Sequence, residues 1–205
     1  VNDVMVNTGQ TCTALTRMLV PRSRYEDALQ IAKTHAESLV VGDPADPKSY
    51  MGPMSSQGQR ETVLDYINKG VAEGASLVTG GTDLPVGIDS GAYVRPTIFA
   101  DVNNQMIIAQ EEIFGPVMCM IPYDTLDEAV ALANDTIYGL SSGVYAKDKA
   151  TAISIARRIR AGQCYTNGGG FSYQAPFGGF KQSGNGREWG DEGLNEFIET
   201  KSILM

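Results

Sequence analysis

Apolar residues that recur every three or four positions predict four amphipathic helices along the chain. They cover residues 25–39, residues 57–73, the stretch that follows Asp124 and the stretch that follows Asp148. Aspartate is a common residue at a helix start, so Asp124 and Asp148 are the expected N-caps. Gly74 is placed to end the second helix, because glycine readily takes the left-handed conformation found there.

Short apolar or alternating runs between these helices predict β-strands. The runs lie at residues 76–79, 93–99, 117–121, 142–146 and 163–166. Residues 117–121 are apolar at every position, which is typical of a strand covered on both faces in a parallel sheet. Because strands and helices alternate through the middle of the chain, the pattern predicts an α/β layered domain.

Two segments fall outside this regular pattern. The first is the polar stretch at residues 7–12, which ends at Cys12. The second is residues 167–186, which hold seven glycines in twenty positions. Glycine at this density serves tight turns or a close approach of the backbone to another group.

Length and charge narrow the class of protein. The 205 residues fit one large domain or two small ones, and a core of that size needs no disulfide or metal. The net charge of −8 argues against nucleic acid or anionic lipid as a partner. No apolar run approaches the roughly 18 residues of a membrane span, and no secretory signal is visible. The chain begins at Val1 with a segment that reads like the inside of a domain, so we expect an excised or truncated part of a longer protein.

The three cysteines, Cys12, Cys119 and Cys164, are widely spaced and form no CxxC pair. The sequence therefore predicts no zinc or other metal site and no redox dithiol. Such cysteine usage fits a reducing, intracellular compartment, and we expect the cytoplasm. His35 is the only histidine, so a cysteine–histidine catalytic pair would have to use it as the base.

Cys12 is the candidate nucleophile among the three cysteines. It stands just ahead of residues 13–17, which are predicted to form a helical turn, and the positive end of a helix dipole stabilises a thiolate. The alternative is that Cys12 packs as a small buried side chain. Cys119 lies in an apolar strand and Cys164 begins another, so both are interpreted as structural.

Two further segments carry polar chemistry. Glu111 and Glu112 precede the buried strand, and because neighbouring strand residues point to opposite faces, only one of them would face a given site. An ionised carboxylate accepts hydrogen bonds from paired sugar hydroxyls. The alternative is a solvated entry into the strand. Residues 176–184, which include Lys181, could cradle a phosphate, although they lack the spacing of the common phosphate-binding loops.

Three motifs follow one another along the chain. They are Asn7-x-Gly9-Gln10-x-Cys12, Glu111-Glu112-Ile113-Phe114-Gly115-Pro116-Val117 and Pro176-Phe177-Gly178-Gly179-Phe180-Lys181-x-Ser183-Gly184. Together they resemble the signature segments of the NAD(P)-dependent aldehyde dehydrogenase superfamily, in order and in approximate spacing. The resemblance extends over nearly all 205 residues. It implies a three-layer α/β catalytic domain with a mostly parallel sheet over residues 1–205.

The resemblance implies the oxidation of an aldehyde to a carboxylic acid with NAD or NADP as cofactor. Cys12 would carry first a thiohemiacetal and then a thioester, which water hydrolyses. The backbone N–H of Cys12 would donate a hydrogen bond to the oxyanion. Glu112 would hold the nicotinamide ribose hydroxyls, and Phe114 would lie beside the nicotinamide.

The resemblance also implies an aldehyde pocket in the last part of the chain. Asn167 matches an asparagine near the substrate, and Phe171 and Phe177 match aromatic walls of the pocket. Residues 168–170 are all glycine, which departs from the bulkier residues of other members. The tail, at about residues 197–205, resembles a strand that pairs within or between subunits, and we expect a homo-oligomer of the full-length protein.

The family's general-base glutamate, its second oxyanion donor and its cofactor-binding half all precede the nucleophile. Only eleven residues precede Cys12 here. We therefore expect the cofactor-binding domain to be absent from this chain and to be its main partner. On its own, the 205-residue chain is expected to bind NAD(P) poorly and to turn over aldehyde negligibly.

Two other functions remain open from the sequence. One is a non-catalytic, aldehyde dehydrogenase-derived domain used for binding or assembly. The intact pattern around Cys12 and Glu112 argues against it, because a domain freed from catalysis has no physical need for a nucleophile there. The other is a cysteine-dependent hydrolase, which would depend on His35 as its only available base.

Overall fold

The computed structural model describes residues 1–205 and separates them into two units, Val1–Leu132 and Ala133–Met205. Each unit has its own sheet. That residues 1–205 form a single catalytic domain stays a prediction. Each unit carries a different part of the predicted site.

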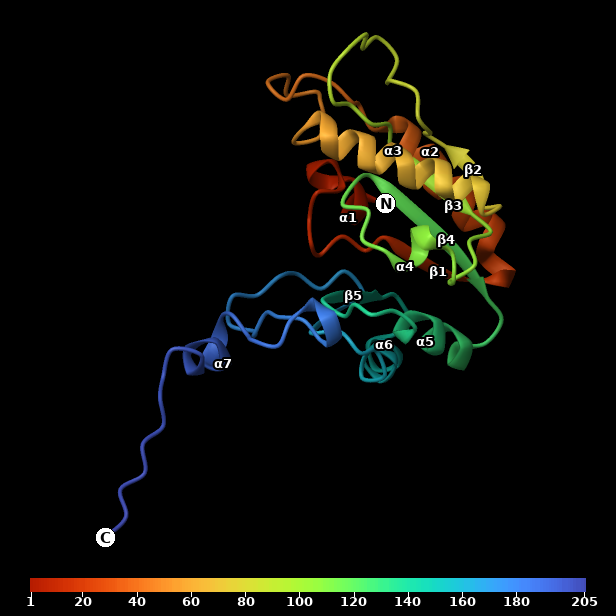
Figure 1. Ribbon diagram of the computed structural model, residues 1–205. Helices are drawn as coiled ribbons and strands as arrows, with labels where there is room; N and C mark the ends of the chain where they lie inside the picture. Colours follow the sequence, from red (N-terminus) through yellow and green to blue (C-terminus); the bar gives the residue numbers. More distant parts are fainter. The chain divides into compact units, whose positions relative to one another are not determined.

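The first unit is built on a four-stranded sheet in the order β1-β4-β3-β2 (Figure 1). The strands are β1 (Arg17–Pro21), β2 (Ser76–Thr79), β3 (Thr97–Ala100) and β4 (Val117–Tyr123). β4 is the central strand and runs parallel to both β1 and β3, while β2 pairs antiparallel at the edge. The prediction of an α/β fold with a mostly parallel sheet is confirmed.

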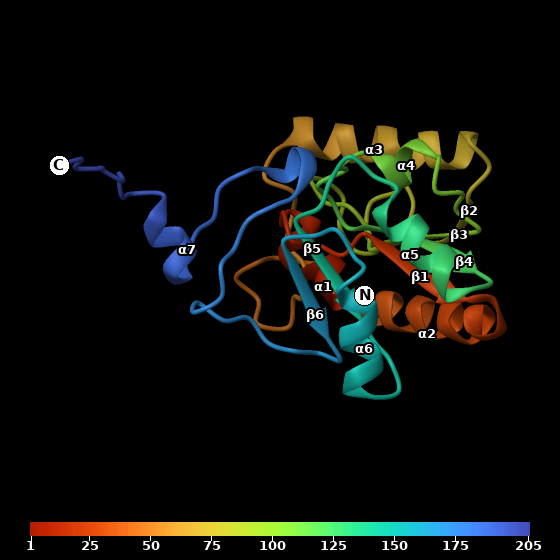
Figure 2. The same ribbon diagram turned by 90° about the horizontal axis from the view of Figure 1, so that it is seen from below.

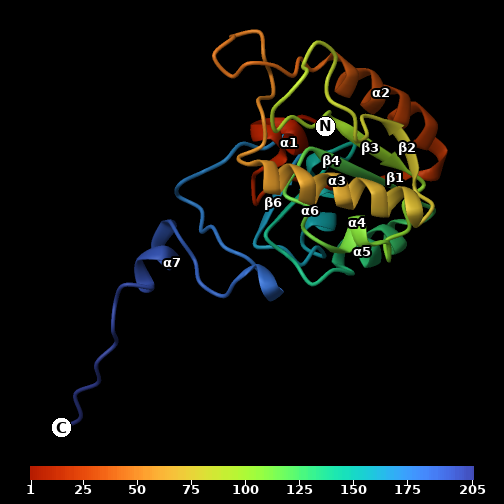
Figure 3. The ribbon, with the colours of Figure 1, turned by 45° about the horizontal axis from the view of Figure 1, so that its top comes forward.

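Helices cover both faces of this sheet, which gives three layers. α1 (Asn2–Met5) and α2 (Tyr25–Ser38) pack on one face, and α3 (Gln57–Ala72) and α4 (Ile107–Gln110) pack on the other. Figure 2 shows α2 and α3 with the strands between them, and Figure 3 shows α4 beside α3 on the same side. Ser56 begins α3 by accepting a 3.1 Å hydrogen bond from the Gln59 backbone N–H, a common helix cap.

Residues 117–121, the apolar run of strand β4, are buried at every position. Val117, Cys119 and Ile121 belong to the core under α3 and α4, whereas Met118 and Met120 belong to the core under α1 and α2. Successive side chains of a strand point to opposite faces, so a strand between two helical layers needs apolar residues at every position. The predicted doubly covered strand is therefore confirmed.

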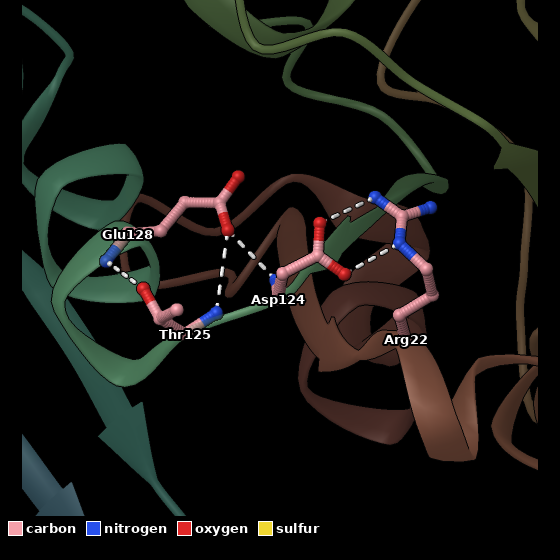
Figure 4. A network of polar contacts seen from close by, with 4 residues as sticks. All are labelled: Arg22, Asp124, Thr125 and Glu128. Atoms are coloured by element: carbon pink, nitrogen blue, oxygen red, sulfur yellow. Dashed lines mark hydrogen bonds and ion pairs between the residues drawn. The ribbon is translucent and has the colours of Figure 1, made fainter.

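The start of α5 (Leu126–Asn134) differs from the sequence prediction, which chose Asp124 as the cap. Thr125 Oγ1 accepts from the Glu128 backbone N–H at 3.2 Å, and Glu128 Oε2 accepts in return from the Thr125 backbone N–H at 3.4 Å (Figure 4). The same Glu128 oxygen also accepts from the Asp124 backbone N–H at 2.7 Å. The reciprocal pair of Thr125 and Glu128 is a capping box, in which the side chains of a threonine and of a glutamate three residues later each accept a hydrogen bond from the other residue's backbone N–H. Asp124 was the wrong residue because its side chain is used elsewhere.

Asp124 forms an ion pair with Arg22, whose Nε and Nη2 donate to its two carboxylate oxygens at 2.7 and 3.1 Å. Arg22 follows β1 and Asp124 follows β4, so the pair ties the ends of two parallel strands together. The hydrogen bonds from Arg22 lower the pKa of Asp124. Both side chains are largely exposed, which limits the stability that the pair contributes.

Replacing Arg22 by glutamine is expected to lower Tm by no more than ~2 °C at neutral pH. A carboxyl group with a lowered pKa in the folded state stabilises the fold above its unfolded pKa, and this contribution is lost as the pH falls through the folded pKa. The difference between Arg22→Gln and wild type should therefore vanish in acid, at about pH 2. Thermal unfolding at the two pH values measures it. Arg24→Gln, which disrupts a longer 3.5 Å pair with Asp27, is the control, and an Arg22 effect that persists in acid would contradict the expectation.

The second unit contains a small sheet of two parallel strands, β5 (Ser141–Val144) and β6 (Gln163–Thr166). α6 (Lys149–Ala156) connects them, and Asp148 begins this helix as predicted, by accepting from the Thr151 backbone N–H at 2.8 Å. The remaining elements of the chain are short. They are η1 (Val6–Gly9), η2 (Arg22–Arg24), η3 (Lys181–Ser183) and α7 (Gly190–Asn195).

The glycine-rich stretch of the second unit makes close backbone contacts. A side chain at Gly162 would overlap the carbonyl oxygen of Gly178. Lys181 lies in the same stretch, and its Nζ donates to the backbone oxygens of Asn134 and Thr136 at 2.6 and 2.9 Å. A lysine at the carboxyl end of a helix satisfies carbonyls that the helix leaves unpaired. The suggested phosphate cradle is therefore not supported, because Lys181 is committed to the end of α5.

Residues 197–205 form neither helix nor strand in this chain. Phe197, Ile203 and Leu204 are almost fully exposed there. The expected pairing of this tail between subunits stays a prediction. None of the helices combines the length and the apolar character that crossing a bilayer would require.

Candidate active site

The segment that leads to Cys12 has an unusual backbone. Asn7, Thr8 and Gly9 adopt φ values of 52°, 57° and 72° in succession, all in the left-handed region. Asparagine and glycine tolerate this conformation, but a β-branched residue such as Thr8 rarely adopts it. Such strain persists only where the surrounding structure fixes the backbone, and it concentrates at functional sites.

Hydrogen bonds hold this strained turn in place. Asn7 Nδ2 donates to the Gln10 carbonyl at 2.9 Å, and Thr8 Oγ1 donates to the Gly52 carbonyl at 3.1 Å. Gln10 Oε1 accepts from the Ser55 backbone N–H at 2.8 Å. The polar residues of the motif therefore fix the loop. A cavity of about 430 Å³ is lined in part by Asn7 and Thr8. The sequence pattern gave no indication of this positioning role for Thr8 and Gln10.

Gly9 joins two of the motifs directly. A Cβ atom at this position would overlap the carbonyl of Gly115 and would lie 2.5 Å from the nitrogen of Pro116. Only glycine, with no side chain and with free access to positive φ, permits such an approach. The Cys12 loop and the Glu112–Gly115 segment, about a hundred residues apart in sequence, are therefore packed backbone to backbone.

Cys12 itself is exposed and follows the strained turn. The predicted helical turn over residues 13–17 is wrong. The Ala14 N–H closes a single turn on the Thr11 carbonyl at 3.0 Å, and strand β1 begins at Arg17. A helix dipole therefore gives Cys12 no assistance, and its suitability as a nucleophile rests on its exposure and on the fixed loop before it.

The other two cysteines are less accessible. Cys119 is fully buried in β4, its Sγ lies 3.3 Å from the Ile108 carbonyl oxygen, and burial raises its pKa to about 12. A thiol in that state is neither ionised nor reachable at neutral pH. Cys164 is half-buried in β6. The structural interpretation of Cys119 fits its burial within the sheet.

The two adjacent carboxylates are both exposed but differ in their hydrogen bonds. Glu111 Oε2 accepts from the hydroxyl of Tyr66 at 2.7 Å, whereas Glu112 is exposed and makes no hydrogen bond or ion pair with the rest of the chain. Glu112 thus keeps all its acceptor capacity for a ligand. Phe114 follows with φ 53° and is 37% exposed, and Gln59 Nε2 fixes its backbone by donating to the Phe114 carbonyl at 3.1 Å.

The predicted pocket residues lie in the second unit. Asn167 directly follows β6 and has φ 48°, and its Oδ1 accepts from the Ala146 backbone N–H at 2.8 Å. Its side chain therefore helps to fix the end of the two-stranded sheet. Phe171 and Phe177 belong to one group of aromatic rings, in which each contacts Trp189. Trp189 was not recognised from the sequence, although it is the only tryptophan of the chain.

The site residues thus fall into two sets. Cys12, Glu112 and Phe114 belong to the first unit, and Asn167, Phe171 and Phe177 belong to the second. Within the first unit, the Gly9 contact brings the nucleophile loop against the segment that carries Glu112 and Phe114. No group of three or more histidine, cysteine, aspartate or glutamate side chains is arranged to hold a metal ion.

Comparison with known proteins gives a consistent result. The model of the aldehyde dehydrogenase family matches residues 1–203. A 3-succinoylsemialdehyde-pyridine dehydrogenase from a Pseudomonas species is 48% identical over 204 residues, which cover 100% of this chain and 43% of that protein. The chain therefore spans less than half the length of this curated relative.

Solved structures agree in fold. A mutant of aldehyde dehydrogenase C from Pseudomonas syringae, complexed with NAD+ and octanal, has a TM-score of 0.96 at 49% identity over 98% of this chain and 41% of that one. A Mycobacterium tuberculosis aldehyde dehydrogenase complexed with NAD+ also has a TM-score of 0.96, at 46% identity over 100% of this chain and 42% of that one. By its motifs, its fold and the family model that matches it, this chain belongs to the aldehyde dehydrogenase family.

Proposed function

We propose that this chain is the nucleophile-bearing part of an enzyme that oxidises an aldehyde to a carboxylic acid with NAD or NADP. The observation that carries the proposal is the contact of Gly9 with Gly115. It holds an exposed cysteine, a carboxylate without a partner and a partly exposed aromatic ring on two adjacent loops. A structural cysteine would need neither the strained turn nor the neighbouring carboxylate.

Cys12 is the proposed nucleophile. Its sulfur adds to the aldehyde carbonyl carbon to give a thiohemiacetal, and after oxidation the acyl group remains on the sulfur as a thioester until water hydrolyses it. The Cys12 backbone N–H is the proposed donor to the oxyanion that forms on addition. The fixed turn before Cys12 supports both roles, because a nucleophile must be positioned within a fraction of an ångström.

Glu112 and Phe114 are the proposed cofactor residues in this chain. A bound NAD or NADP supplies the acceptor for the hydride that leaves the thiohemiacetal. The residues present fit such a group, since the Glu112 carboxylate has free acceptor sites for ribose hydroxyls and the Phe114 ring is open to a planar partner. The complexes of two family members with NAD+ support the same cofactor here.

Asn167, Phe171 and Phe177 are the proposed residues of the aldehyde pocket, and the octanal complex of a family member supports an apolar substrate. The proposed partners are a cofactor-binding domain and further copies of the full-length protein. The three free cysteines are consistent with the cytoplasm as the compartment. A hydrolase is not favoured, because His35 Nε2 lies 2.6 Å from Asn2 Oδ1 and is not hydrogen-bonded to Cys12.

The isolated 205-residue polypeptide is expected to oxidise propanal at a rate at least ~10³-fold below that of an aldehyde dehydrogenase with both halves. The eleven residues before Cys12 include no glutamate, so the chain lacks a candidate for the family's general base there. NADH formation with the pure polypeptide measures the rate. Steady NAD-linked oxidation of propanal by this polypeptide alone would contradict the division of roles proposed here.

Cys12 is expected to react with iodoacetamide at least ~10-fold faster than the other two cysteines under native conditions. Cys12 is exposed, whereas Cys119 is buried and its pKa is raised to about 12. Peptide mass spectrometry after timed labelling identifies the modified residue, and labelling in urea serves as the control in which all three react. If Cys119 or Cys164 were modified first in the folded chain, the assignment of the nucleophile would be wrong.

A further inference from the structure

Four aromatic side chains of the second unit form one cluster around Trp189. The ring centroid of Trp189 lies 4.8 Å from that of Phe171, 5.2 Å from that of Tyr173 and 5.0 Å from that of Phe177. Phe171 and Tyr173 also contact each other edge to face at 4.9 Å. Trp189 is the one member that contacts all three others, so it is the centre of the cluster.

The backbone brings these rings together from two segments. Phe177 and Glu188 exchange two backbone hydrogen bonds of 2.7 Å, which hold the segment before Trp189 against the segment after Tyr173. Trp189 itself adopts φ 61°, a conformation that non-glycine residues rarely take. Next to it, Gly190 lies close under the loop, since a Cβ there would be 2.9 Å from the Gln174 carbonyl oxygen. The indole ring of Trp189 contacts the two rings that this loop carries.

The cluster is open to solvent on the loop side. Phe171 is 45% exposed and Tyr173 is 73% exposed, whereas Phe177 and Trp189 are partly buried behind them. All four side chains are aromatic. Contiguous exposed aromatic rings on a stable support are typical of a surface that binds an apolar group.

We propose that Trp189 is a positioning residue that determines substrate specificity, because it holds Phe171, Tyr173 and Phe177 as one aromatic surface for the aryl or long alkyl tail of an aldehyde. This inference rests on the proposed function and deepens it. Trp189 contacts Phe171 and Tyr173 edge to face and Phe177 at a tilt of 38°. The two edge-to-face contacts fix the loop that carries Phe171 and Tyr173, and such contacts stabilise by more than the buried area alone. Short polar aldehydes gain nothing from this surface, so the cluster selects for apolar tails.

The first test uses Trp189 as its own reporter, since it is the only tryptophan of the chain. Cinnamyl alcohol has an aryl tail but no carbonyl, so it measures binding without reaction at Cys12. It is expected to change the Trp189 fluorescence in a saturable way, whereas glycerol is expected to have no effect. An unchanged signal with cinnamyl alcohol would overturn the proposal, as would emission that responds only to dilution of the protein, which would assign the cluster to contact between copies.

Variants separate positioning from folding. Equilibrium dialysis is expected to show at least ~5-fold weaker binding of cinnamyl alcohol to Trp189→Leu and near wild-type binding to Trp189→Phe, which keeps a ring. Tyr145→Ser removes an exposed aromatic outside the cluster and is expected to bind as wild type does. Circular dichroism confirms that each variant is folded, and Tyr173→Ser provides a second, exposed position if Trp189→Leu is not. Equal binding by wild type and by both Trp189→Leu and Tyr173→Ser would overturn the role of the cluster.

The two proposals fail in different ways. If cinnamyl alcohol binds at Trp189 but Cys12 is not the reactive thiol, the aromatic surface stands and the proposed oxidation falls. If Cys12 reacts as expected but Trp189 gives no saturable signal, the oxidation stands and the specificity role of Trp189 falls.

Discussion

Cys12→Ser is expected to lower the rate of aldehyde oxidation by at least ~10³-fold in a protein that joins this chain to a cofactor-binding domain. Serine keeps the shape of the side chain but is a far weaker nucleophile, because its hydroxyl is not ionised at neutral pH. The loop before Cys12 is held by its own hydrogen bonds, and none of them involves the Cys12 side chain. Initial rates of NADH formation at saturating aldehyde measure the loss.

The matched control is Cys164→Ser, which replaces a half-buried thiol of β6 by the same residue. We expect this variant to keep more than about half of the wild-type rate, because Cys164 has no proposed role in the reaction and serine is close to cysteine in size. Thermal unfolding of both variants should show that they are folded. The proposal fails if Cys12→Ser remains active while Cys164→Ser is inactive.

The elements that were predicted well are those whose pattern is decided locally. The strands at residues 76–79 and 163–166 have the predicted limits, and α2 and α3 end within a residue of theirs. In these stretches the periodicity of apolar positions and the helix caps lie within the segment itself. The cap of α5 was predicted at Asp124 but is Thr125. The side chain of Asp124 instead forms an ion pair with Arg22, a residue of another segment, which the local pattern does not show.

The features that were missed depend on contacts between distant residues. Residues 13–17 read as a helical turn, but the chain is drawn into strand β1 by pairing with β4, where Arg17 lies opposite Cys119. Likewise, the motifs named Cys12 and Glu112 as site residues, yet nothing local predicts that Gly9 packs on Gly115. The fold decides which distant residues a strand or a glycine contacts. A local sequence pattern carries no information about partners a hundred residues away.

Gly9→Ala is expected to destabilise the fold by at least ~3 kcal/mol, because it combines two separate costs. The first is backbone strain, since Gly9 has φ 72° and alanine tolerates this poorly. The second is overlap of the new methyl group with the Gly115 carbonyl, which neither backbone can avoid without moving. Urea unfolding of the two proteins measures the difference in the free energy of unfolding.

Gly87→Ala separates these two costs. Gly87 has a similar φ of 81°, but a Cβ there would have no atom within 4 Å, so only the backbone strain of about 1 kcal/mol applies. Equal destabilisation by the two variants would mean that the Gly9–Gly115 contact is not present in solution. A larger loss for Gly9→Ala, with slower labelling of Cys12 in the molecules that remain folded, would show that the contact also positions the nucleophile. Gly9 then contributes both to the stability of this region and to the contact between the two motifs from which the function is inferred.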